Sequence, residues 1–69
     1  MWSKEEKMKK WLESVKDDAK QRSVDELMKA VDVLEVKVPK NESEKKAIKL
    51  MLQIYEYEIQ VRMWQLNEA

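Results

Sequence analysis

Hydrophobic residues recur along most of this 69-residue chain at intervals of three and four positions, the spacing of one face of an α-helix. We predict three helices on this basis, at about residues 4–21, 24–36 and 42–67. Residues 1–69 are therefore expected to form a single all-α domain. The first apolar stripe consists of Met8, Trp11, Leu12, Val15 and Ala19, and the second of Val24, Leu27, Met28, Val31 and Leu34.

The first two stripes do not share one continuous helix face. At 100° per residue, the second stripe is rotated by about 140° to 160° from the position that an unbroken first helix would give it. We therefore expect the helix to break near Arg22. One straight helix that touches two different partners would produce the same pattern, and such fused helices would form a hairpin that dimerises into a larger bundle.

Each predicted helix begins with a small polar residue that is followed three positions later by Glu. In such a capping box, the first side chain accepts a hydrogen bond from a free backbone N–H of the opening turn. The three pairs are Ser3 with Glu6, Ser23 with Glu26, and Asn41 with Glu44.

The end of the second helix is the least clear boundary. Val36 and Val38 alternate with Lys37 as in a strand, and Pro39 disfavours helical geometry at Val38. A lone strand has no pairing partner, so we expect the helix to end near Val36 and a connection to run through Asn41.

The third helix carries two apolar series. The first is expected to pack on the other helices: Ile48, Leu52, Tyr55, Ile59, Met63 and Leu66. The second has the spacing of a coiled-coil seam: Ala47, Leu50, Ile54, Tyr57, Val61 and Trp64. Together they cover about 260° of the helix circumference, more than two short helices are expected to shelter.

We therefore predict a protein interface at Leu50, Ile54, Tyr57, Val61 and Trp64. The alternative is a monomer whose own helices wrap both series. For a homodimer an antiparallel arrangement is preferred, because Trp64 would then face the smaller Ala47 or Leu50. Glu58 and Arg62 lie at the edge of this seam with the spacing of a helical ion pair, which would set the register of an interface or remain a partly exposed pair.

The composition favours no catalytic or metal chemistry. The chain has no Cys, no His and no Gly, so the usual zinc ligands, imidazole catalysis and glycine-rich phosphate loops are excluded. Neighbouring carboxylates such as Glu56 with Glu58 point in different directions on a helix and do not converge on a substrate. We expect no enzyme activity, no cofactor, no metal site and no small-molecule substrate.

The number and distribution of charges do not indicate a polyanionic partner. Lys plus Arg and Asp plus Glu number 14 each, and acidic residues interrupt the lysine-rich first helix, so neither nucleic acid nor membrane binding is expected. The first residues are charged where a secretory signal would be apolar, which favours the cytoplasm. The absence of Gly, Cys, His, Phe and Thr is also compatible with a synthetic sequence, for which no compartment applies.

These patterns together predict an all-α, up-down-up three-helix bundle with a long C-terminal helix, which dimerises through that helix. The expected role is structural: a self-associating bundle without catalytic activity, natural or designed. A binding module that presents the third helix to a target protein is the main alternative, and a small bacterial or phage regulatory protein is another.

Overall fold

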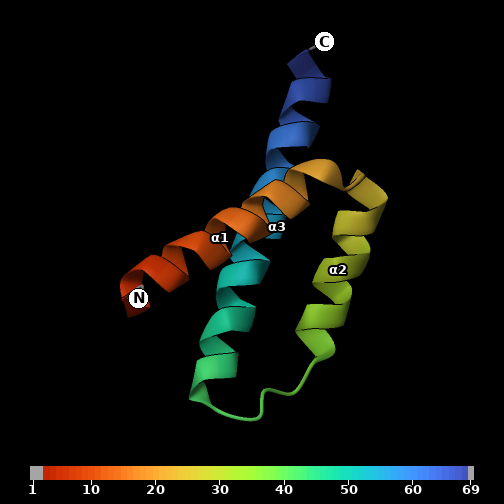
Figure 1. Cartoon of the computed structure of the whole chain (residues 1–69). Coiled ribbons are helices and arrows are strands. Elements are labelled where there is room, and N and C mark those ends of the chain that lie inside the picture. Colours follow the sequence, from red (N-terminus) through yellow and green to blue (C-terminus); the bar gives the residue numbers. More distant parts are fainter. Residues whose placement is uncertain (1–2, 69) are drawn as a thin grey trace.

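The computed structural model describes residues 3–68, and the side chains of residues 3–66. Over residues 3–68 the chain forms three α-helices and no strand (Figure 1): α1 (Lys4–Gln21), α2 (Val24–Val36) and α3 (Glu42–Glu68). The predicted all-α, three-helix fold is therefore confirmed. The long third helix ends one residue later than expected.

All three helices begin with the cap that the sequence indicates. The Ser3 and Ser23 hydroxyls accept hydrogen bonds from the backbone N–H groups of Glu6 and Glu26 at 3.2 and 3.3 Å. Asn41 Oδ1 accepts one from the Glu44 N–H at 2.8 Å. Each bond satisfies a donor that the first helical turn leaves free, which fixes where the helix starts.

The break between α1 and α2 falls where the rotation of the apolar stripes places it. Arg22 and Ser23 both have extended backbones, with ψ of 149° and 164°, and the Arg22 N–H bonds back to the Ala19 carbonyl at 3.3 Å. Two extended residues suffice to redirect the chain, so the alternative of one straight helix is wrong for this structure. At the far end α2 stops at Val36, as predicted, and Lys37 pairs across the connection with Glu44 at 3.9 Å.

The helices are arranged around α3 (Figure 1). α2 runs back along the N-terminal part of α3, whereas α1 crosses α3 obliquely. The up-down-up bundle expected from the sequence therefore differs from the structure in the direction of α1. Ala19 of α1 is almost completely buried, and the side chain of Arg62 of α3 bonds to its carbonyl.

The core lies where the three helices meet. Among the described residues, Val15, Ala19, Leu27 and Tyr55 are buried. Further side chains pack against them while partly exposed: Trp11, Ala30, Val31, Leu34, Met51, Ile54 and Ile59. The molecule is thin, with principal extents of 45 × 28 × 14 Å, so α3 is covered by other helices along only part of its length.

The inner stripe of α3 was predicted correctly only in part. Tyr55 is buried and Ile59 packs against the core, but Met63 is 47% exposed and Leu66 is 73% exposed. The reason is the position of the turn between α1 and α2. Arg22 contacts α3 at Arg62, and the turns of α3 that follow project past both companions (Figure 1).

Candidate protein–protein interface

The structure divides the predicted interface into a covered part and an exposed part. Leu50 is half-buried and lines a hollow shared with Trp11 of α1, and Ile54 packs against the core. Tyr57 and Trp64 are both 67% exposed, and Val61 between them is half-buried. We call Tyr57, Val61 and Trp64 the outer patch.

The outer patch occupies one side of α3, from Tyr57, which lines a hollow shared with α1, to Trp64, which lies beyond the contact of Arg62 with Arg22. At 100° per residue its three side chains fall within about 60° of the helix circumference. Met63 and Leu66, which are also exposed, lie on roughly the opposite side, with Leu66 beside Val24 at the start of α2. The C-terminal half of α3 therefore presents two separate apolar surfaces, of which the outer patch carries two aromatic side chains.

The whole molecule exposes more surface than its mass requires. Its solvent-accessible area is 5942 Å2 for 8.3 kDa. Compact monomers of that mass expose about 4,600 Å2. The excess of about 1,300 Å2 is larger than the roughly 800 Å2 that each partner buries in a standard protein interface. The chain thus has enough uncovered surface for a specific interface.

Beside the outer patch, a groove separates α1 from α3. Its apolar lining residues are Ala19, Ile54 and Tyr57, and its polar ones are Lys16, Lys20, Gln53 and Glu58. Tyr57 belongs to both features, so the groove continues directly into the outer patch. We call this feature the α1–α3 groove.

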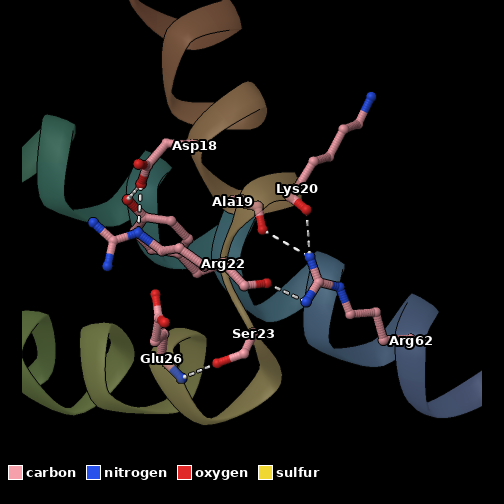
Figure 2. A network of polar contacts seen from close by, with 8 residues as sticks. Asp18, Ala19, Lys20, Arg22, Ser23, Glu26 and Arg62 are labelled. Carbon is pink, nitrogen blue, oxygen red and sulfur yellow. Dashed lines mark hydrogen bonds and ion pairs between the residues drawn. The ribbon is translucent and has the colours of Figure 1, made fainter.

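Arg62 holds α3 against the end of α1 at this position (Figure 2). Its guanidinium donates to the main-chain carbonyls of Ala19 at 3.0 Å and Lys20 at 2.8 Å, and also to that of Arg22. The last carbonyls of a helix lack partners within the helix, and Arg62 supplies hydrogen-bond donors to the carbonyls at the end of α1.

Arg62 is itself oriented by Glu58. The predicted ion pair is present, with Arg62 Nε donating to Glu58 Oε1 at 3.1 Å, and both side chains are about four-fifths buried, with exposures of 22% and 18%. The i, i+4 spacing indicated this pair from the sequence. Nothing in the sequence indicated the contact with α1, because it joins residues more than forty positions apart.

A second polar cluster on the opposite side of the turn was also missed. Asp18 Oδ2 accepts a hydrogen bond from Arg22 Nε at 2.7 Å and another from the Tyr55 hydroxyl at 3.2 Å. Figure 2 shows Asp18 and Arg22 together at the end of α1. The spacing of Asp18 and Arg22 could have indicated their pairing, whereas the contact with Tyr55 depends on the fold.

This cluster shifts the pKa values of its members. The hydrogen bond from Arg22 is the main cause that lowers the pKa of Asp18 below its ordinary value. The hydrogen bond from Tyr55 lowers this pKa further, whereas desolvation by burial raises it and offsets part of the shift. Burial, followed by the hydrogen bond to Asp18, raises the pKa of Tyr55. Asp18 is therefore favoured as a carboxylate and Tyr55 as a neutral phenol in the folded chain.

The described residues offer little for other kinds of site. Within residues 3–68 no group of three or more acidic, His or Cys side chains is placed to hold a metal ion. None of the helices in that range has the length and apolar character needed to cross a bilayer. No protein-family model, no curated protein and no solved structure matches the chain.

Proposed function

We propose that this chain is a structural, self-associating helical protein that pairs with a second copy of itself through the outer patch. The observation that carries the proposal is the exposure of Tyr57 and Trp64, 67% each, on one side of α3 and two turns apart. Soluble monomers rarely leave large contiguous apolar patches uncovered, and Val61 joins the two aromatic side chains into one apolar surface. The proposal includes no catalytic activity, and the narrow residue alphabet supports a sequence chosen for its fold and assembly.

The energetics favour a dimer of modest affinity. Burying a large apolar side chain completely contributes about 1.5 to 3 kcal/mol. Two copies would bury four aromatic side chains that are each about two-thirds exposed, which amounts to roughly 4 to 8 kcal/mol before Val61 is included. The loss of translational and rotational freedom costs at least about 4 kcal/mol. The net gain of at most about 4 kcal/mol corresponds to a dissociation constant of about 1 mM, which the burial of Val61 lowers.

An antiparallel pairing centred on Val61 fits the structure best. In that arrangement Tyr57 of one copy lies beside Trp64 of the other, and the opposed helix dipoles attract. Pairing along the whole of α3 is disfavoured, because Leu50 and Ile54 are already partly covered by α1 and the core. Trp64 would thus face Tyr57, not Ala47 or Leu50 as the sequence alone indicated.

The main alternative uses the same surface for a different partner. A binding module would insert Tyr57, Val61 and Trp64 into an apolar groove of a target protein. Self-association is favoured by the α1–α3 groove, because the chain itself carries an apolar recess next to its own exposed aromatic residues. A closed two-fold dimer would cover both features in both copies.

A matched pair of variants tests the proposal by sedimentation equilibrium. Val61→Glu places a charge in the centre of the outer patch, and Leu66→Glu places one on the other side of the same helix. We expect Val61→Glu to abolish the dimer while the helical circular dichroism is kept, and Leu66→Glu to leave the dimer intact. A wild-type dimer that survives Val61→Glu but is lost with Leu66→Glu would overturn the assignment to the outer patch.

A further inference from the structure

The α1–α3 groove has a shape and chemistry that suit one aromatic side chain. It encloses about 430 Å3 and is open on one side. Its lining includes the apolar side chains of Ala19, Ile54 and Tyr57, while Gln53 and Glu58 have oxygen atoms that can accept a hydrogen bond. Trp has this combination of a large apolar body and a single N–H donor.

We infer that the α1–α3 groove of each copy receives the indole of Trp64 of the partner subunit, so that the dimer is held by two reciprocal Trp insertions. The inference rests on the dimer proposed above and specifies which surface the partner's Trp64 enters. In this arrangement the groove of one copy and Trp64 of the other form one binding site. Neither copy can fill its own groove with its own Trp64.

The antiparallel geometry brings the two together. With Val61 on the two-fold axis, a residue three positions toward the C-terminus in one helix lies level with the residue three positions toward the N-terminus in the other. The partner's Trp64 is therefore level with Glu58, at the rim of the groove and one turn from Ile54. Tyr57, which also lines the groove, is adjacent to Glu58 along the helix.

The charges around the groove are complementary to the incoming helix end. Lys16 and Lys20 lie on the α1 side of the groove, and the acidic Glu58 on the α3 side is already paired with Arg62. The C-terminal end of α3 carries the negative pole of the helix, and its last turn holds no basic residue. In the antiparallel dimer this end of the partner passes the two lysines, which supply the missing positive charge.

Intermolecular NOEs test the insertion directly. Equal amounts of 13C-labelled and unlabelled chain are mixed, and a half-filtered experiment records only contacts between copies. We expect contacts from the Trp64 ring protons to the methyl groups of Ala19 and Ile54. A chain that stays monomeric at millimolar concentration would refute the dimer itself. A dimer whose Trp64 contacts only Val61 or Leu66 of the other copy would refute the insertion and leave the dimer standing.

Two matched substitutions give an independent measurement of the same contact. Trp64→Ala should weaken the dimer by about 30-fold or more, as for a buried Trp at the centre of an interface, whereas Leu66→Ala should change it by less than about threefold. Lys16→Glu should weaken it by about fivefold, and Lys9→Glu, an exposed lysine on the same helix but away from the groove, should not. Equal effects of the two lysine changes would overturn the placement of the partner's helix end.

Discussion

The guanidinium of Arg62 donates a hydrogen bond of 3.0 Å to the main-chain carbonyl of Ala19, and so ties the projecting helix to the end of the first one. The same side chain reaches the carbonyls of Lys20 and Arg22. One residue thus donates to several carbonyls at the end of α1, of which that of Ala19 also accepts the Arg22 N–H. It also fixes where α3 emerges from the core, and hence which of its turns remain exposed.

Replacing Arg62 should therefore destabilise the fold. Arg62→Met removes the bonds to α1 and leaves Glu58 without its partner, which we expect to cost about 1.5 to 3 kcal/mol in the free energy of unfolding. Urea denaturation followed by circular dichroism measures this value. Arg22→Met is the matched control: it removes an exposed ion pair with Asp18, whose loss should cost less than about 1 kcal/mol. Equal losses for the two variants would contradict the capping role.

Acid should weaken the fold partly through Asp18. Its pKa is lowered in the folded chain, chiefly by the hydrogen bond from Arg22, so the folded state favours the carboxylate. This contribution is present above the ordinary pKa of 3.8 and is lost as the pH falls through the lowered folded value. The free energy of unfolding of Asp18→Asn should consequently depend less on pH below about 4 than that of the wild type. Parallel curves for the two proteins would exclude this contribution.

High pH should weaken the fold partly through Tyr55. Burial and the hydrogen bond to Asp18 raise its pKa, so the folded state favours the neutral phenol. The stabilisation is present below the ordinary pKa of 10.0 and is lost as the pH rises through the raised folded value. Tyr55→Phe should remove this part of the alkaline loss of stability, as measured by urea denaturation between pH 9 and pH 11, whereas the exposed Tyr57→Phe should keep it. The opposite ranking of the two variants would contradict this assignment.

Leu27 should be the most sensitive position in α2. It is fully buried, with 0% exposure, and Leu27→Ala should cost about 2 to 5 kcal/mol. In a molecule with so small a core, this loss is expected to unfold most of the population at room temperature. Val33→Ala, on the exposed side of α2 at 62%, should leave the thermal midpoint nearly unchanged.

The two positions of the predicted interface that differ most in environment should respond differently to the same substitution. Ile54 packs against the core, so Ile54→Glu should unfold the chain. Val61 is half-buried and is not among the side chains that pack against the core, so Val61→Glu should remain helical. Circular dichroism at low concentration separates the two results. A folded Ile54→Glu variant would show that position 54 tolerates a charge and does not belong to the core.

The sequence predicted the local features of this fold well. Helix starts follow from Ser3, Ser23 and Asn41, and the break at Arg22 follows from the rotation of two apolar stripes, because these signals act within one or two turns. The direction of α1 across α3 could not be predicted, since it depends on the burial of Ala19 and on the long-range contacts of Arg62. The burial of Leu50 and Ile54 and the exposure of Leu66 follow from that crossing. The local pattern alone could therefore not give the exposure of these three side chains.

Molar mass as a function of concentration tests self-association most directly. Light scattering of the wild-type chain from micromolar to millimolar concentration should rise from 8.3 kDa toward twice that value and stop there, because a two-fold interface closes on itself. A constant mass of 8.3 kDa across the whole range would contradict the account. A mass that keeps increasing beyond the dimer would contradict it as well, since it would indicate open-ended association and not a closed two-fold dimer.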